Sequence, residues 1–386
     1  MRGAAPIAFY APMKSPDHPA PSGDRTMARL LMNALRLAGF APTLASGLRT
    51  WDGAGDAAFQ RQAKRDSLAE ANRLAAAWRD GPASERPRLW FTYHVYYKAP
   101  DWIGPRAADA LGIPYVVAEA SRAGRRARGP WTLGHQGAEA ALDRADVIFT
   151  VTEADRESLD RGRPERQQVI DFPPFIDLME WAACGAAFSP LEPGALDSMA
   201  KIPRLLAVAM MRAGDKLASY RLLARALAGA EGEPWTLDIV GDGDARGEVE
   251  GLFTGLRERV TFHGGIEDRE RLAALYRAAD LLVWPAVNEA YGMVFLEAQA
   301  FGCPVLAGAY GGVASVVRDG ETGVLAAPGD ASAFADALSS LIRDAARRRE
   351  LGEAARRFVA TERGIAQAAS RLRETLMPVM AETVPP

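Results

Sequence analysis

The sequence contains few of the features that mark secreted, zinc-bound or membrane-spanning chains. Its two cysteines, Cys184 and Cys303, lie far apart and outside any paired motif, so we expect neither a disulfide framework nor a zinc site. No apolar run reaches the roughly 18 residues of a membrane helix, and the N-terminal apolar stretch is too short and proline-rich for a signal peptide. Net charge −3 gives no general attraction to nucleic acid. These absences predict a cytoplasmic protein with no nucleic-acid partner, and they leave peripheral membrane contact open.

The length of the chain suits two domains of ordinary size. It has 386 residues, of which 48% are hydrophobic and 25% charged. Apolar runs that are typical of buried strands alternate with helical patterns, and this alternation predicts doubly wound parallel α/β sheets. A long helix is expected over residues 56–78. The expected strands cover residues 7–10, 41–44, 88–95, 113–120, 146–152, 203–211, 235–240, 260–266 and 280–284.

In a doubly wound sheet, ligands bind beyond the carboxyl ends of the strands. In the first half, His94 and Glu119 stand at two such ends, and we interpret both as candidates for binding a second substrate. A lone histidine is more often structural than functional, so that reading of His94 stays open. A loop with arginines at positions 122, 125, 126 and 128 follows. It is either a solvated surface or a grip for an anionic acceptor or a lipid headgroup.

The most informative stretch covers residues 286–312, directly after the expected strand 280–284. Glu289 and Glu297 are eight residues apart, which on a helix is a reach of roughly 12 Å, close to the length of a nucleoside diphosphate sugar. Between them, Gly292, Met293 and Val294 would offer backbone N–H groups at a helix N-terminus, where a diphosphate is favoured. Two solvated glutamates are the alternative reading.

Together, this strand, the turn and the EAYGMVFLE, GCPVLA and YGG segments resemble the donor-site signature of retaining glycosyltransferases of family 4. The resemblance implies an α/β GT-B fold, in which two Rossmann-like doubly wound domains face a cleft. It places an acceptor-side domain at residues 1–185 and a donor-binding domain at residues 203–363. A C-terminal helix at residues 364–386 would pack back on the first domain, and residues 178–201 would link the two.

The resemblance also assigns roles to residues. Arg212 and Lys216 would neutralise the donor diphosphate, although either cation alone could equally be a solvated surface group. Glu289 would act with them by holding the transferred sugar, and Glu297 would hold the ribose. In the first domain, Glu119 occupies the position where many family members carry a histidine. The remaining donor contacts would come from Gly292, Met293, Val294, Gly23, Gly241, His263 and Gly312.

The expected reaction is retaining transfer of a sugar from a UDP-, GDP- or ADP-sugar to a hydroxyl of a sugar, lipid-linked or small-molecule acceptor. No metal or other cofactor is expected. The glycines at 241, 243 and 247 do not match a dinucleotide-binding fingerprint, because the third is one position late. A phosphorylase, a nucleotide-sugar epimerase and a non-catalytic sugar-binding protein remain as alternatives.

Overall fold

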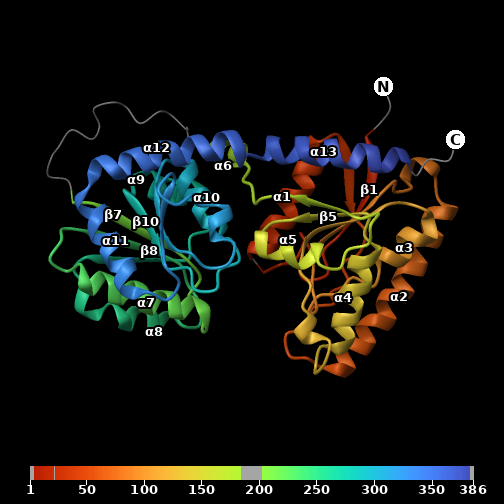
Figure 1. Ribbon diagram of the computed structural model, residues 1–386, viewed down its shortest axis with the longest axis horizontal. Coiled ribbons are helices and arrows are strands. Elements are labelled where there is room, and N and C mark those ends of the chain that lie inside the picture. Colours follow the sequence, from red (N-terminus) through yellow and green to blue (C-terminus); the bar gives the residue numbers. More distant parts are fainter. Residues whose placement is uncertain (1–3, 21, 184–201, 383–386) are drawn as a thin grey trace. The chain divides into compact units, whose positions relative to one another are not determined.

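A computed structural model describes residues 4–20, 22–183 and 202–382. The chain forms two compact units (Figure 1). Unit 1 comprises Met1–Pro173 with Ile365–Pro386, and unit 2 comprises Pro174–Gly364. Each unit is built on a six-stranded parallel sheet flanked by helices, so the predicted α/β doubly wound class is confirmed.

The sheet of unit 1 has the strand order β2-β1-β3-β4-β5-β6. Helices α2, α3 and α4 contact one another on one face, while α1 and α13 pack together on the other. The strands are β1 Ala5–Tyr10, β2 Phe40–Leu44, β3 Trp90–Val95, β4 Tyr115–Ala120, β5 Val147–Thr150 and β6 Gln168–Asp171. The helices are α1 Gly23–Leu37, α2 Ala57–Asp80, α3 Gly104–Leu111, α4 Thr132–Arg144, α5 Glu153–Asp160 and α13 Ile365–Glu382, with 3-10 turns η1 Ala83–Glu85 and η2 Gly124–Arg126.

Local capping explains where the first long helices begin. Ser22 precedes α1, and its side chain accepts a hydrogen bond from the backbone N–H of Arg25. Asp56 precedes α2 and accepts from the N–H groups of Ala58 and Phe59. Both side chains satisfy N–H groups that have no partner inside the helix. The predicted helix 56–78 therefore agrees with α2 to within two residues.

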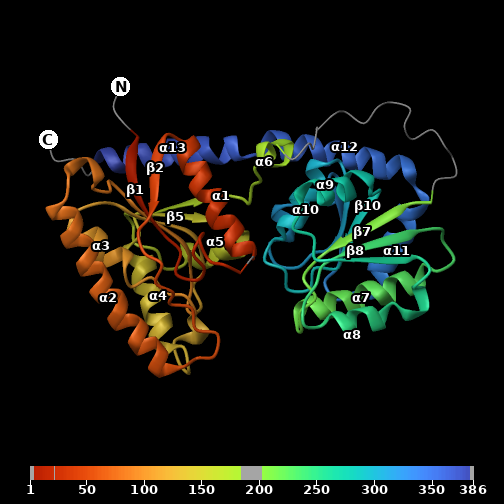
Figure 2. The ribbon, with the colours of Figure 1, turned by 180° about the vertical axis from the view of Figure 1, so that it is seen from behind.

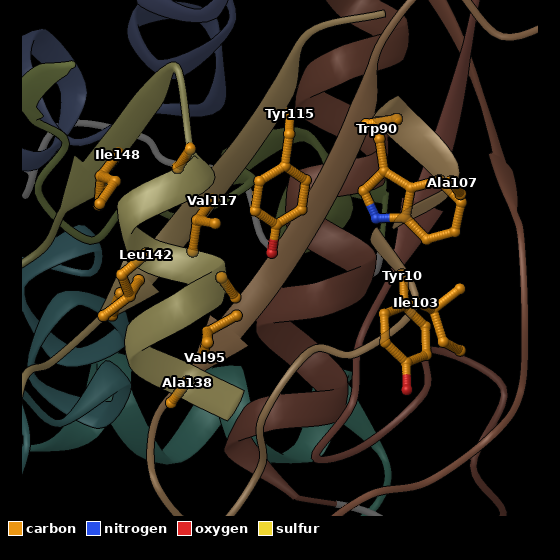
Figure 3. Packing of buried hydrophobic residues seen from close by; sticks show 14 of the residues in the cluster. Tyr10, Trp90, Val95, Ile103, Ala107, Tyr115, Val117, Ala138, Leu142 and Ile148 are labelled. Carbon is orange, nitrogen blue, oxygen red and sulfur yellow. The ribbon is translucent and has the colours of Figure 1, made fainter. Parts of the chain in front are cut away.

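The central strands of unit 1, β1, β3, β4 and β5, are largely buried, as expected for a covered parallel sheet. Figure 3 shows Tyr10, Trp90 and Tyr115 packed in this core. A buried carboxylate, Asp101, lies beside them and accepts hydrogen bonds from the Thr92 hydroxyl at 2.6 Å and the Tyr115 hydroxyl at 2.9 Å. Burial raises the pKa of Asp101 although these hydrogen bonds oppose the shift. This network holds the segment that follows β3.

The C-terminal helix α13 belongs to unit 1, where it packs against α1 (Figure 2). The Arg373 guanidinium donates to the carbonyl oxygen of Ala38 at 3.0 Å, and that of Arg371 donates to the carbonyl oxygen of Asp171 at 2.8 Å. These contacts connect the last helix to the ends of α1 and β6.

The sheet of unit 2 has the strand order β12-β11-β10-β7-β8-β9. Helix α7 contacts α8 and α11 on one face, and α10 contacts α12 on the other. The strands are β7 Arg204–Val208, β8 Thr236–Val240, β9 Val260–Gly264, β10 Leu281–Trp284, β11 Val305–Gly308 and β12 Gly323–Ala326. The helices are α6 Leu178–Ala183, α7 Asp215–Gly229, α8 Arg246–Leu252, α9 Arg269–Ala278, α10 Met293–Ala300, α11 Ala331–Arg343 and α12 Ala345–Glu362, with η3 Thr254–Leu256 and η4 Val313–Ser315.

Residues 174–183 pack within unit 2, whereas the sequence-based boundary placed them in the first domain. Residues 178–183 were expected to belong to a linker, and instead they form α6. The Trp181 ring lies edge-on to the rings of Tyr276 and Phe301, with centroids 6.0 and 5.4 Å away. This aromatic contact explains why the segment is ordered against unit 2. The rest of the expected linker, residues 184–201, lies outside the described residues.

Candidate functional site

Two loops meet at the carboxyl edge of the unit 2 sheet, because β7 and β10 are neighbours. The loop after β7 leads into α7, and the loop after β10 leads into α10. The Lys216 ammonium forms an ion pair with the Glu289 carboxylate. The Ser219 hydroxyl accepts from the N–H of Val287 at 2.9 Å, and the side-chain amide of Asn288 donates to Asp215 at 2.9 Å. These three links fix one loop against the other.

The backbone of the β10–α10 loop is strained. Ala286 and Asn288 have φ angles of 58° and 51°, in the left-handed region that non-glycine residues seldom occupy. Each such residue costs on the order of 1–3 kcal/mol and persists only when its surroundings enforce it. Gly292 follows with a φ of 74°, and a Cβ atom there would lie 2.6 Å from the Phe295 ring and 3.3 Å from Glu289 Cγ. The turn therefore requires glycine and brings Glu289 close to the start of α10.

Helix α10 begins at Met293, and no side chain caps it. The N–H groups of Met293 and Val294 have no acceptor inside the helix. The positive end of the helix dipole is consequently available to an anion next to the Lys216–Glu289 pair. Because the helix begins at Met293, Glu289 lies in the preceding turn. The rise of about 1.5 Å per helical residue therefore applies only to the part of the interval from Met293 to Glu297.

The two predicted cations of unit 2 differ in their surroundings. Lys216 is half-buried, and its ammonium lies 5.7 Å from the centre of the Trp284 ring as well as against Glu289. Arg212 is exposed directly after β7 and forms no ion pair with any described residue. Lys216 is thus held in place by its contacts, while the exposed Arg212 guanidinium is available to a ligand.

Glu297 lies on α10 and accepts a hydrogen bond from the Tyr276 hydroxyl at 2.7 Å. Burial raises the pKa of Glu297, and Tyr276 and Arg269 oppose that shift. The same burial and the neighbouring carboxylate raise the pKa of Tyr276 well above its usual value. Glu297 is therefore a positioned side chain and not a solvated helical glutamate.

Two predicted glycine contacts have structural explanations instead. The Gly312 N–H donates to the carbonyl oxygen of Ala290 at 2.6 Å, so this N–H is not free for a donor phosphate. The Gly241 N–H donates to the carbonyl oxygen of Gly264 at 2.9 Å. A Cβ at Gly241 would lie 1.9 Å from the carbonyl oxygen of Ala209, so close packing requires glycine there.

The other two predicted donor contacts lie in separate units. His263, at the end of β9, has its Nε2 atom 2.6 Å from a carboxylate oxygen of Asp238. Gly23 is the first residue of α1, and a Cβ there would meet nothing within 4 Å. Packing therefore does not require glycine at position 23.

In unit 1, the structure brings the predicted residues His94 and Glu119 together. The β3–β4 register pairs Tyr93 with Ala118 and Val95 with Ala120, which puts His94 opposite Glu119. Both have left-handed backbones, with φ angles of 64° and 61°. Two adjacent strained residues at strand ends are a feature of functional sites.

Asp24, in the first turn of α1, completes this cluster and was not among the predicted site residues. Its Oδ1 atom lies 3.2 Å from His94 Nδ1, and the Glu119 carboxylate lies 3.6 Å from the same nitrogen. The available signal was its position next to Gly23 in a long loop after the first strand.

The charges in this cluster depend on one another. Burial opposes the charge on His94, but Glu119 and Asp24 outweigh it and raise the His94 pKa. Burial raises the pKa of Glu119, with His94 opposing. Burial also acts to raise the pKa of Asp24, but the contact with His94 lowers it overall. The directions of these pKa shifts favour the charged forms of His94 and Asp24 and the protonated form of Glu119.

Known proteins resemble this chain in sequence and in fold. Residues 208–358 match the family described as glycosyl transferases group 1. A D-inositol 3-phosphate glycosyltransferase of Mycobacterium avium is 30% identical over 305 residues, which cover 74% of this chain and 69% of that relative. The chain belongs to the group 1 glycosyltransferases. The enzyme of the same name from Mycolicibacterium paratuberculosis is 32% identical over 303 residues, 74% of this chain and 66% of the relative.

The matched region thus spans about two thirds of these relatives, 66% of one and 69% of the other. Solved structures of other proteins resemble this chain over nearly its full length. Sucrose-phosphate synthase from Thermosynechococcus elongatus superposes with a TM-score of 0.72 at 23% identity, covering 98% of this chain and 100% of that one. Anabaena HepE in complex with UDP-glucose gives 0.67 at 18% identity, covering 97% and 99%. The predicted GT-B fold is confirmed.

The described part of this group 1 chain has neither a membrane-spanning helix nor a cluster of metal-binding side chains. Over residues 4–20, 22–183 and 202–382, no helix is both long and apolar enough to cross a membrane. Within the same described residues, no group of three or more histidine, cysteine, aspartate or glutamate side chains could hold a metal ion.

Proposed function

We propose that this protein transfers a sugar from a nucleoside diphosphate sugar to an acceptor hydroxyl with retention of anomeric configuration. The observation that carries the proposal is the Lys216–Glu289 ion pair beside the open N-terminus of α10. A cation and a carboxylate held side by side match a donor in which an anionic diphosphate adjoins a sugar rich in hydroxyl groups. The donor would bind to unit 2 and the acceptor to unit 1.

The diphosphate would be held by positive groups from two loops. Arg212 and Lys216 come from the β7–α7 segment, and the N–H groups of Met293 and Val294 come from the start of α10. As the sugar–phosphate bond breaks, negative charge grows on the departing diphosphate. Fixed positive groups at that position lower the barrier because they need no rearrangement during the reaction. Chelation of the diphosphate by a metal ion is not required in this scheme.

The two glutamates would hold opposite ends of the donor. Glu289, next to Lys216, would accept hydrogen bonds from hydroxyls of the transferred sugar. Glu297, which the Tyr276 hydroxyl positions, would accept hydrogen bonds from the ribose. A carboxylate close to a diphosphate is unfavourable on its own, and pairing with Lys216 offsets that repulsion.

At the acceptor side, His94, Glu119 and Asp24 would orient the attacking hydroxyl. The acceptor oxygen forms a bond to the anomeric carbon on the face from which the diphosphate leaves. The bond from that carbon to the phosphate oxygen breaks, and its electron pair stays with the phosphate. The acceptor proton passes to the same leaving oxygen, so that atoms and charge balance and configuration is retained.

A binding screen tests the donor first. Purified protein is heated with UDP-, GDP- and ADP-sugars, since solved structures of the similarly folded Anabaena HepE are complexes with UDP and with UDP-glucose. A ligand at 100 times its dissociation constant stabilises the fold by about 2.7 kcal/mol. Glu289→Gln should abolish the preference among sugars with the same base. If no nucleotide sugar raises the melting temperature, the proposal is wrong.

Turnover assays then separate the alternatives. D-inositol 3-phosphate is the first acceptor to test, because the two sequence relatives described above are named for it. Nuclear magnetic resonance of the product reports the anomeric configuration, and inversion would refute retention. Strict dependence on inorganic phosphate would indicate a phosphorylase. Conversion of the donor sugar without any acceptor would indicate an epimerase.

A further inference from the structure

A row of aromatic rings in unit 1 starts at His94 and ends between two cations. The His94 ring centre lies 4.9 Å from that of Tyr96, the Tyr96 centre lies 5.5 Å from that of Tyr97, and the Tyr97 centre lies 5.8 Å from that of Trp131. We call Tyr96, Tyr97 and Trp131 the aromatic row. It connects the strand-end cluster of His94 to the arginine loop before α4.

Two cations share the far end of the aromatic row. The Lys98 ammonium lies 5.8 Å from the Tyr97 ring centre and 5.4 Å from that of Trp131. The Arg126 guanidinium lies 5.2 Å from each of the same two rings. Neither cation forms an ion pair or a hydrogen bond with a carboxylate anywhere in the described part of the chain. Arg122 of the same loop differs, because it pairs with Glu139 and Asp143.

Hydrogen bonds hold in place the segments that carry these rings. The Trp131 indole N–H donates to the carbonyl oxygen of Asp52 at 3.0 Å, and the Asp52 N–H donates to the carbonyl oxygen of Lys98 at 2.8 Å. The Gln60 side-chain amide donates to the Asp52 carboxylate at 2.7 Å and to the Pro130 carbonyl oxygen at 2.8 Å. These bonds join the segments before α2, after β3 and before α4, so the two cations stand on a preformed support.

Two like charges beside the same pair of rings repel each other. Cation–π attraction offsets this only in part, at roughly 0.5–1 kcal/mol for an exposed contact. A bound anion would relieve the repulsion and receive charge-assisted hydrogen bonds from both side chains. The arrangement therefore favours a ligand with a negatively charged group.

The exposure of the rings favours a discrete ligand over a bilayer. Tyr97 and Trp131 are only half-buried residues whose faces the cations cover, and no tyrosine or tryptophan is among the exposed large hydrophobic residues of the described chain. A surface that inserts into a membrane needs protruding apolar side chains. The cations lie over their rings and do not surround such side chains.

We propose that Lys98 and Arg126, supported by Tyr97 and Trp131, form a subsite for an anionic group, of the phosphate class, on the acceptor. This inference rests on the proposed function, since it assumes that the acceptor hydroxyl lies at His94. The acceptor would extend along the aromatic row, with its neutral, hydroxyl-bearing part near His94 and Glu119 and its anionic group between the two cations.

The test compares charged and uncharged probes on the full chain. D-glucose 6-phosphate, D-inositol 3-phosphate, inorganic phosphate and the two unphosphorylated parents are titrated by calorimetry. We expect at least one sugar phosphate to bind about tenfold more tightly than its parent, which corresponds to about 1.4 kcal/mol. Lys98→Ala with Arg126→Ala should remove that difference. Lys98→Arg with Arg126→Lys keeps both charges and should retain most of it.

A matched control removes two other cations from the same unit. Arg61 and Lys64 lie on α2 and contact neither the aromatic row nor a described carboxylate. Arg61→Ala with Lys64→Ala should leave the preference for sugar phosphates intact. The proposal is overturned if the control loses the preference equally, if no sugar phosphate binds better than its parent, or if inorganic phosphate binds as tightly as every sugar phosphate.

Two further measurements separate this inference from its alternatives. Donor binding and slow donor hydrolysis should be unchanged in the Lys98 and Arg126 variants. If the wild-type protein itself neither binds nor hydrolyses the donor, that result counts against the proposed function and not against the subsite. Sedimentation with phosphatidylglycerol and phosphatidylcholine vesicles tests a membrane. Retention on the anionic vesicles that disappears in the double alanine variant would overturn the acceptor subsite in favour of a lipid surface.

Discussion

The Lys216 ammonium lies against the Glu289 carboxylate, although the two residues are 73 positions apart in the chain. Both side chains are partly buried, with 27% and 19% of their surface exposed. Lys216 is proposed to serve the leaving diphosphate and Glu289 the transferred sugar. In this proposal the two residues serve opposite sides of the bond that breaks. Because they are in contact, a change in one residue alters the environment of the other.

Lys216→Ala should slow sugar transfer more than it weakens donor binding. The charge that Lys216 meets is larger in the transition state than in the bound donor, and loss of such a contact costs about 10²–10³ in rate. Steady-state kinetics at saturating donor and calorimetry with intact donor give the two effects. Arg221→Ala, also on α7 and paired with exposed Glu248, is the control and should change neither. Equal losses in rate and affinity would reduce the role of Lys216 to binding.

Glu297→Gln and Glu289→Gln should affect different parts of the donor. Glu297→Gln should weaken free nucleoside diphosphate and nucleotide sugar alike, by roughly 1.5–3 kcal/mol for a charged hydrogen bond to the ribose. Glu289→Gln should weaken only the nucleotide sugar and remove most turnover. Calorimetry of both variants with both ligands measures four affinities.

Tyr276→Phe is the control for Glu297, because it removes the 2.7 Å hydrogen bond but keeps the carboxylate. It should weaken both ligands less than Glu297→Gln does. If Glu289→Gln lost nucleoside diphosphate as severely as Glu297→Gln, the proposed orientation of the donor would be wrong.

The stabilising effect of His94 should depend on pH. Its folded-state pKa is raised above the ordinary value of about 6.5, because Glu119 and Asp24 outweigh burial. Protonation of His94 therefore stabilises the fold fully below about pH 6.5, and this contribution is lost as pH rises through the raised folded value. Melting temperatures of wild type and His94→Asn should differ more at about pH 6 than at about pH 9.

Asparagine is chosen at position 94 because it tolerates the left-handed φ of 64°. A difference between wild type and His94→Asn that stays constant or grows toward high pH would contradict the assigned partners.

Chelation of divalent metal should leave transfer intact. Arg212, Lys216 and the N–H groups at the start of α10 already offer positive charge to a diphosphate. Initial rates with and without EDTA measure the effect. Complete loss of activity, restored by magnesium or manganese, would show that the diphosphate needs a metal ion in this protein.

The sequence by itself determined the fold class and the family. Apolar runs alternating with helical patterns specify buried strands between helices, because burial of each run depends mainly on its own residues. The same local logic identified the strand ends at which His94, Glu119, Arg212 and Lys216 stand. The turn around Gly292 could also be predicted, since its residues are contiguous.

Only the tertiary structure decided which side chains meet. The Lys216–Glu289 pair and the hydrogen bond from Gly312 to Ala290 depend on the packing of distant loops. The same is true of the position of Lys98 and Arg126 beside the Trp131 ring. Strand register set His94 opposite Glu119, and aromatic packing of Trp181 turned an expected linker segment into α6. Local sequence patterns determine which residues are buried. The partner of a charged or polar side chain depends instead on which group from a distant part of the chain the fold brings next to it.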